Sequence, residues 1–193
     1  MSLHALILAA GGSSRFGAEP KQLAKINGQT MLERAVESAL SISDTSVVLG
    51  CEHQRLMPVV QMAGVIIHSE WQEGIGSSIA CGVASLPNNV SAVMVLLCDQ
   101  VAVTAEDLKL LVKCYNNSLR NESAGQITCA TYAGRLGVPA IFPRRYFPQL
   151  ISLKGDVGAK KILEANAVLT VPLERAAIDI DTPENLNHFI QRS

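Results

Sequence analysis

The segment from residue 5 to residue 23, ALILAAGGSSRFGAEPKQL, constrains the fold more than any other part of the chain. An apolar run leads directly into a loop rich in glycine and serine. Glycines allow turns with positive φ and let backbone N–H groups approach an anion closely. Ser13 and Ser14 add hydroxyl donors. Arg15 can bind a phosphate through two parallel N–H bonds, and Lys21 supplies a mobile positive charge. The segment is typical of a β-strand that ends in a phosphate-binding loop; the alternative is an ordinary strand-to-helix turn of small residues.

The spacing of this loop differs from two familiar phosphate-binding motifs. The dinucleotide fingerprint G-x-G-x-x-G does not match GGSSRFG at residues 11–17. The Walker motif G-x-x-x-x-G-K-[ST] requires Lys and then Ser or Thr after its second glycine. Gly12 and Gly17 have the right separation, but Ala18 and Glu19 follow them. The loop therefore indicates a phosphate site of another class.

Strand-like and helix-like segments alternate along the chain, and apolar residues at helical spacing mark the helices. The predicted strands are residues 3–9, 45–51, 65–68, 92–98, 127–132, 138–142 and 168–172, with a polar loop at 116–126. The predicted helices are residues 29–42, 52–63, 76–86, 104–119, 144–150, 156–165 and 182–190. This order predicts a single α/β domain over residues 1–193, a three-layer sandwich around a Rossmann-like, mainly parallel sheet. Ligands of such sheets bind beyond the carboxyl ends of the strands.

Composition narrows the classes of function. The net charge is −1 and no long basic stretch occurs, which argues against nucleic-acid binding. No apolar run reaches about 18 residues, so we expect no membrane span, and the N-terminal MSLHALILAAGG is predicted to be the first strand rather than a signal peptide. The five cysteines are odd in number and form no C-x-x-C motif, which favours reduced thiols and a cytoplasmic protein. The four histidines are scattered and predict no zinc site.

Two acidic positions are candidates for holding a metal ion. Asp99 directly follows the apolar run AVMVLLC, so it lies at the carboxyl end of a buried strand, on the same sheet edge as the glycine loop. Mg²⁺ takes one or two protein carboxylates and completes its shell with water and phosphate oxygens. The alternative role for Asp99 is a turn or helix N-cap. Asp156, between two glycines, is a second candidate ligand that could also cap the helix that follows it. Asp179 and Asp181 are interpreted as structural, at a strand end and at the N-cap of the last helix.

With these residues identified, the chain resembles the molybdenum cofactor cytidylyltransferases within the MobA-like NTP transferase family. The resemblance extends over nearly the whole chain. It consists of the segments LAAGGSSRFG and PKQL, SEWQEGIGSSI, VLLCDQ, GRLGVPAIF, LKGDVGAKKIL and DIDTPENL. It implies a fold of the nucleotide-diphospho-sugar transferase type. Two positions depart from the family pattern: Val101 replaces a usual proline, and the spacing between Gly17 and Lys21 is one residue longer than in close relatives.

The resemblance also implies roles for individual residues. Arg15, Lys21 and Asp99 would be catalytic, and Asp99 and Asp156 would bind Mg²⁺. Ala10, where guanylyl-transferring relatives carry glycine, indicates CTP rather than GTP. The acceptor would be the terminal phosphate of molybdenum-loaded molybdopterin, with a client molybdoenzyme as a further partner. The nucleotide would contact Leu8, Ala9, Ala10, Gly11, Gly12, Ser13, Arg15, Lys21, Gly74, Ser77, Ser78 and Asp99.

Such a reaction explains why no Cys–His or Ser–His catalytic motif stands out. An acceptor phosphate is largely a dianion at neutral pH, so the enzyme needs to align anions and suppress their repulsion rather than supply a strong base. Three alternatives remain at this stage. One is another nucleotidyl transfer, either with GTP or to another phosphorylated small molecule. Another is a non-catalytic nucleotide- or cofactor-binding chaperone for a molybdoenzyme. The third is a dinucleotide-binding oxidoreductase, which the loop spacing disfavours.

Overall fold

The computed structural model describes residues 2–17, 19–120 and 125–192, so part of the predicted polar loop at 116–126 lies outside the described residues. Seven strands form one sheet in the order β5-β4-β1-β6-β8-β7-β9, and two short strands form a separate hairpin. Every neighbouring pair in the large sheet that does not involve β8 is parallel, which confirms the predicted mainly parallel sheet. The strands are β1 (Leu3–Ala9), β2 (Lys25–Ile26), β3 (Gln29–Thr30), β4 (Asp44–Leu49), β5 (Gly64–Ile67), β6 (Ala92–Leu97), β7 (Ile127–Tyr132), β8 (Arg135–Pro143) and β9 (Val168–Pro172).

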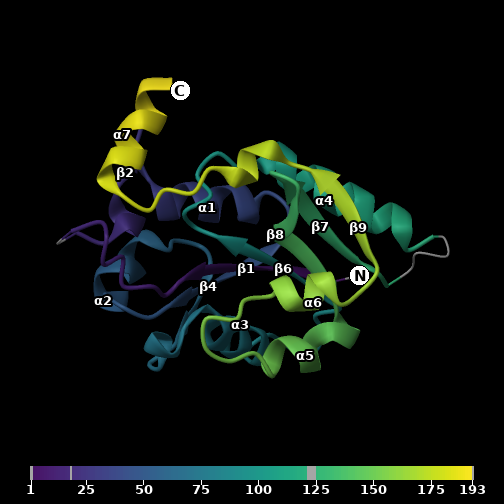
Figure 1. Ribbon diagram of the computed structural model, residues 1–193. Helices are drawn as coiled ribbons and strands as arrows, with labels where there is room; N and C mark the ends of the chain where they lie inside the picture. Colours follow the sequence, from purple (N-terminus) through teal and green to yellow (C-terminus); the bar gives the residue numbers. More distant parts are fainter. Residues whose placement is uncertain (1, 18, 121–124, 193) are drawn as a thin grey trace.

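Helices cover both faces of the large sheet, as a three-layer sandwich requires (Figure 1). Helices α1 and α4 pack on one face, and α3, α5 and α6 pack on the other, so that two separate apolar cores form. None of the helices in the described ranges is long and apolar enough to cross a membrane. The helices are α1 (Met31–Leu40), α2 (His53–Leu56), α3 (Ile75–Ala84), α4 (Ala105–Ser118), α5 (Phe147–Ile151), α6 (Lys160–Glu164) and α7 (Pro183–Arg192).

The two central strands show why the sequence folds this way. Strands β1 and β6 are continuous apolar runs whose residues are nearly all buried, as expected for strands covered on both faces. Helices α1 and α4 each begin with a capping box, formed by Thr30 with Glu33 and by Thr104 with Asp107. These caps fix the residues at which the two helices begin, Met31 and Ala105.

Several predicted helices are shorter than their sequence patterns suggest, for local reasons. The helix predicted at 29–42 starts at Met31, because Asn27 and Gly28 adopt positive φ and close the β2–β3 hairpin. The helix predicted at 52–63 ends at Leu56 and continues only as a 3₁₀ turn that contains Pro58, which lacks an N–H donor. The helix predicted at 156–165 begins only at Lys160.

A small third apolar cluster joins the C-terminal helix to the loops at the carboxyl edge. Its buried members are Ile26, Met31, Val101 and Ile180. Phe16, Ala24, Leu186 and Phe189 pack against them and are partly buried. In Figure 1, α7 accordingly lies at the end of the molecule where β2 and the loop after β1 are found. Asp181 directly follows Ile180 of this cluster in the chain. The Ile180 N–H donates to the Asp99 carbonyl oxygen at 3.1 Å.

Candidate functional site

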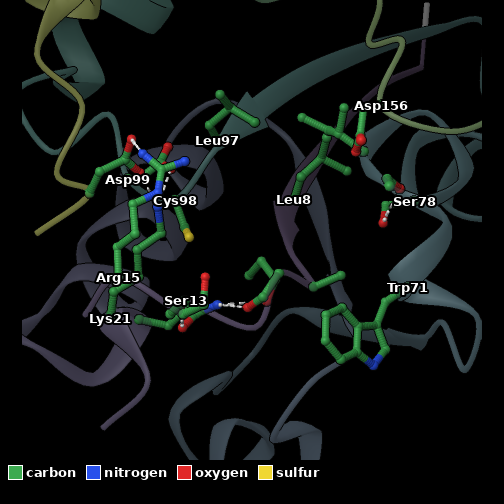
Figure 2. Close-up of a pocket in the computed structure, with 18 of the residues that line it drawn as sticks. Leu8, Ser13, Arg15, Lys21, Trp71, Ser78, Leu97, Cys98, Asp99 and Asp156 are labelled. Carbon is green, nitrogen blue, oxygen red and sulfur yellow. Dashed lines mark hydrogen bonds and ion pairs between the residues drawn. The ribbon is translucent and has the colours of Figure 1, made fainter. Parts of the chain in front are cut away.

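A cavity of about 370 Å³ opens at the carboxyl ends of β1 and β6, where an α/β sheet is expected to bind its ligand. Its walls come from the loop after β1, the residues that follow β6, the start of α3, the loop before α6 and the segment before α7. Figure 2 shows these side chains around the opening. The residues that line it are Leu8, Ala9, Ala10, Gly11, Ser13, Ser14, Arg15, Lys21, Gln22, Trp71, Gln72, Gly74, Ile75, Ser78, Leu97, Cys98, Asp99, Asp156 and Asp181.

The glycine loop is held in place by Gln22, a residue that the sequence analysis did not single out. Its side-chain amide donates to the carbonyl oxygens of Ala9 at 3.1 Å and Gly11 at 3.0 Å, and its Oε1 accepts from the Ser13 hydroxyl at 3.1 Å. Ser13 has a φ of 52° and its carbonyl accepts from the Phe16 N–H at 2.8 Å, so the loop turns tightly at this point. Gln22 is 1% exposed, so its buried side chain holds the loop in place from the protein interior.

The positive and negative groups of the site meet at one end of the cavity, which we call the charged end: Arg15, Lys21, Asp99 and Asp181. The Lys21 ammonium donates to Asp99 Oδ2 at 2.6 Å and to Asp181 Oδ1 at 2.9 Å. Arg15 reaches Asp181 Oδ2 at 3.4 Å, although its side chain is 75% exposed. Sequence analysis expected Arg15, Lys21 and Asp99 at one site, and the structure places them together.

The pKa values of these groups follow from their contacts. Burial alone would lower the pKa of Lys21, but the charge of Asp99 and the hydrogen bonds to Asp99 and Asp181 raise it overall. The hydrogen bond from Lys21 lowers the pKa of Asp181. Burial, together with the nearby charges of Asp99 and Asp181, raises the pKa of Asp179 to about 6. Lys21 is thus a firmly protonated cation between two carboxylates.

The structure corrects the predicted roles of two aspartates. Asp181 does not act as a helix cap; its carboxylate faces the cavity, whereas the Thr182 hydroxyl accepts from the Asn185 N–H at 3.2 Å in the first turn of α7. Asp156 also lines the cavity, but Figure 2 shows it across the opening from Asp99. Nor does Asp156 cap α6, whose N-cap is Ala159. The acidic residue brought next to Asp99 is therefore Asp181.

The fit of a divalent metal ion can be tested on these carboxylates. Asp99 Oδ1 is buried and has no hydrogen-bond partner among the described residues, which leaves one oxygen free at the charged end. A cation, the Lys21 ammonium, already lies between Asp99 and Asp181. No group of three or more His, Cys, Asp or Glu residues that could hold a metal occurs in the described part of the chain. Two carboxylates suit Mg²⁺ that is shared with substrate phosphates rather than a site formed by protein alone.

The turn before α3 and the start of α3 line the cavity with Trp71, Gln72, Gly74, Ile75 and Ser78. Together with Asp156, which lies against Gly74, they form the end of the cavity opposite the charged end (Figure 2), which we call the Trp71 end. Gly74 has a φ of 112° and lies directly against the Asp156 carboxylate, where any larger side chain would collide with it. The Gly76 N–H donates to the Gly155 carbonyl at 2.8 Å, which docks the loop before α6 onto the start of α3 and explains why α6 begins late.

Two residues predicted to contact the nucleotide are not among the described residues that line the cavity. The Ser77 hydroxyl donates to the Gly74 carbonyl at 2.8 Å and is 3.0 Å from His68 Nε2, and both side chains are buried. Because the Ser77 hydroxyl donates its proton to the Gly74 carbonyl, its oxygen accepts from the His68 ring N–H. The pair therefore supports the turn at Gly74 instead of facing a ligand. Gly12 lies against the Trp71 ring instead.

The cysteines remain free thiols, and two lie in the core as expected. Cys98 is buried beneath the charged end, where burial and the neighbouring Asp99 charge raise the pKa of its thiol to about 12. Burial raises the pKa of Cys129 to about 11. Thiols with such pKa values stay protonated, so neither is suited to act as a nucleophile.

Comparison with known proteins places this site in a family. The model of the MobA-like NTP transferase domain matches residues 5–171. The chain belongs to the MobA-like NTP transferase family. This membership makes a nucleotidyltransferase the class of enzyme to which the chain is related.

Among curated relatives, two resemble this family member over nearly their whole length. Nicotine blue oxidoreductase from Paenarthrobacter nicotinovorans is 27% identical, with 96% of this chain and 95% of the relative covered. The purine catabolism protein PucB from Bacillus subtilis is 28% identical, with 93% and 91% covered. The names of these two relatives indicate different roles.

Solved structures confirm the fold. Rv0371c from Mycobacterium tuberculosis H37Rv superposes with a TM-score of 0.83 at 22% identity over 98% of this chain and 97% of that one. The same protein has been crystallised in complex with manganese. CMP:2-keto-3-deoxy-manno-octonic acid synthetase complexed with CTP superposes with a TM-score of 0.74 at 14% identity, over 100% and 98% of the chains. The expected nucleotide-diphospho-sugar transferase type of fold is therefore confirmed.

Proposed function

We propose that this protein is a nucleotidyltransferase that moves CMP from CTP to the terminal phosphate of molybdenum-loaded molybdopterin and releases pyrophosphate. One observation carries the proposal. The loop with Arg15 and the Lys21 ammonium share a cavity with three carboxylates, and one of these, Asp99, has an oxygen without a hydrogen-bond partner among the described residues. The choice of CTP and of the acceptor rests on the sequence resemblance, in which Ala10 replaces the glycine of guanylyl-transferring relatives.

The reaction would be an in-line displacement at the α-phosphorus of CTP. An oxygen of the acceptor phosphate forms the new P–O bond, the bond to the β-phosphate breaks, and pyrophosphate leaves with the electron pair. The acceptor is already largely a dianion near neutral pH, so no strong general base is needed. Lys21, Arg15 and the loop N–H groups would neutralise the phosphates and hold them in line.

We further propose that a divalent ion, Mg²⁺, is held by Asp99 and Asp181. When bound, such an ion neutralises the triphosphate and acts as a Lewis acid. The unpartnered oxygen of Asp99 and the cation already lying between the two carboxylates support this pair. The earlier expectation that Asp156 would be the second ligand is not retained, because Asp156 lies at the other end of the cavity.

The acceptor would occupy a second cavity of about 230 Å³, which shares Leu8, Ile75 and Leu97 with the first. Arg135 and Lys160 contribute positive charge to its walls. Because the two cavities share three wall residues, an acceptor bound in the second cavity would hold its terminal phosphate close to the nucleotide.

The test is a pyrophosphate-release assay with CTP, GTP and Mg²⁺, with and without molybdenum-loaded molybdopterin. We expect release that depends on both CTP and the acceptor. Asp99→Asn should reduce turnover by at least 100-fold, while the matched control Asp44→Asn, an exposed residue at the far end of β4, should not. Near-normal turnover by Asp99→Asn would rule out the proposed metal role.

A second candidate is a redox function, which the name of the relative nicotine blue oxidoreductase favours. The glycine loop lacks the G-x-G-x-x-G spacing of dinucleotide-binding enzymes, which speaks against it. Oxidation of NADH or NADPH by the protein with an electron-accepting dye, in the absence of pyrophosphate release, would favour the redox function. Tight CTP binding without either reaction would instead support a cofactor-binding chaperone.

A further inference from the structure

Trp71, the single tryptophan of the chain, forms part of the cavity wall and has no role in the reaction described above. It lies in a 3₁₀ turn, Trp71–Glu73, just before α3. Two glycines form the recess that holds it. A Cβ on Gly12 would lie 2.9 Å from the Cη2 atom of the indole, and a Cβ on Gly50 would lie 2.5 Å from Trp71 Cβ. The indole is therefore packed tightly between the end of β4 and the phosphate loop, in a fixed position.

The position of this ring relative to the charges matters. Figure 2 shows Trp71 across the cavity from Arg15, Lys21 and Asp99. At the Trp71 end the lining is formed mainly by small, apolar and uncharged polar groups, and its charged member, Asp156, is an anion. With Mg²⁺ at Asp99 and Asp181, as proposed above, the charged end would have a net positive charge and attract a triphosphate, whereas Asp156 would repel it. The nucleoside of a bound nucleotide would then extend toward the indole.

We infer that Trp71 is the base-contacting residue of the nucleotide site, with its indole packed against the nucleobase. This inference rests on the proposed function. Contact of a base with an aromatic side chain strengthens nucleotide binding and is tolerant of base identity, because every base has a π-face. Trp71 would therefore strengthen the binding of all nucleotides similarly, and the selection of one base over another would come from polar groups such as the backbone around Ala10.

The experiment compares CTP with tripolyphosphate, which has the phosphates but no base. Wild-type protein is titrated with each ligand in the presence of Mg²⁺, and the tryptophan fluorescence and the heat of binding are recorded. We expect CTP to change the fluorescence strongly. Tripolyphosphate should compete with CTP but change the fluorescence little.

Trp71→Leu and Trp71→Phe then separate the aromatic contact from the filling of the recess. Trp71→Leu should weaken the binding of CTP and GTP by similar factors of about 5- to 100-fold, while tripolyphosphate affinity stays unchanged; Trp71→Phe should recover most of the loss. The inference is overturned if Trp71→Leu binds CTP as wild type does. It is also overturned if tripolyphosphate loses affinity by the same factor, since Trp71 would then act only by supporting the phosphate loop.

These outcomes are independent of turnover, because they measure binding. Absence of pyrophosphate release with normal CTP-induced fluorescence changes would refute the proposed function and leave the contact between base and indole standing. Turnover of CTP without any effect of Trp71→Leu on CTP affinity would support the proposed function and refute the contact between base and indole. Failure of every nucleotide to bind would refute both.

Discussion

Replacing Lys21 by methionine removes the positive charge that lies between two carboxylates at the charged end of the cavity. The two oxygens that accept from Lys21 are 2.6 and 2.9 Å from its Nζ atom. They are therefore at most about 5.5 Å apart, and two unit charges at that distance repel each other by about 3 kcal/mol at an effective dielectric constant of about 20. Because the Asp181 side chain is 44% exposed, solvent reduces this repulsion. We expect Lys21→Met to lower the free energy of unfolding by about 1–2 kcal/mol at pH 7 without metal.

The pH dependence of this loss gives a stringent check. The Lys21 hydrogen bond lowers the pKa of Asp181, so the stabilisation it provides is present above the unfolded pKa of about 4 and disappears as the pH falls through the lower folded value. The difference between wild type and Lys21→Met in urea denaturation should therefore shrink below pH 4. An equal difference at pH 3 and pH 7 would refute the electrostatic explanation.

The same variant should respond to metal in a characteristic way. With the ammonium gone, Asp99 and Asp181 can both turn to a divalent ion, so Mn²⁺ should bind more tightly in the absence of nucleotide than it does to wild type. CTP turnover should nevertheless fall by about 100-fold or more, because the triphosphate loses its cation. The control is Lys113→Met, at an exposed position of α4, which should change neither quantity. Weaker Mn²⁺ binding by Lys21→Met would contradict the assignment of this carboxylate pair.

Three further predictions concern stability and loop position. Gln22→Leu removes three hydrogen bonds that hold the phosphate loop, so it should lower the free energy of unfolding by about 2 kcal/mol and raise the KM for CTP. The control Gln149→Leu, at an exposed position, should change neither quantity. Gly76→Ala places a Cβ 2.6 Å from a backbone carbonyl oxygen of the docked loop and should destabilise by about 1–3 kcal/mol in thermal unfolding, whereas Gly158→Ala, with its nearest neighbour at 3.6 Å, should be tolerated. Asp179, with its pKa raised to about 6, destabilises the fold progressively as the pH rises from its unfolded pKa of about 4 to 6. Asp179→Asn should therefore be more stable than wild type by about 1 kcal/mol at pH 8, since solvent screens this partly exposed carboxylate, and equally stable at pH 4.

Much of the fold follows from local sequence signals. The continuous apolar runs of β1 and β6 predict buried central strands, and Thr104 with Asp107 predicts the start of α4. The placement of the glycine loop and Asp99 on one edge follows from the rule that parallel strands end on the same side. What a local pattern cannot show is how the loop before α6 docks through the Gly76 N–H, which delays α6 until Lys160.

The site was predictable to the extent that its residues follow strands directly. Asp99 follows the end of β6 and Arg15 lies in the loop after β1, whereas Lys21 comes from the 3₁₀ turn beyond that loop, and all three meet in the cavity. The local pattern DTPEN predicts a helix start at Asp181, but the long-range hydrogen bond from the Ile180 N–H to the Asp99 carbonyl returns this segment to the site. The sequence does not predict the role of Gln22, because an uncharged side chain next to a lysine carries no sign that it is buried.

The packing of α7 and Phe16 on the same small apolar cluster has a practical consequence for experiments that attach the protein to a surface. Phe16 belongs to the phosphate loop, and the same small cluster contains Ile180, next to Asp181. A tether that pulls on α7 would transmit force to the loop and the carboxylate pair. A linker placed before Leu3 joins the chain at the start of β1, on the edge of the sheet opposite the opening, and would leave the ligand-binding groups undisturbed.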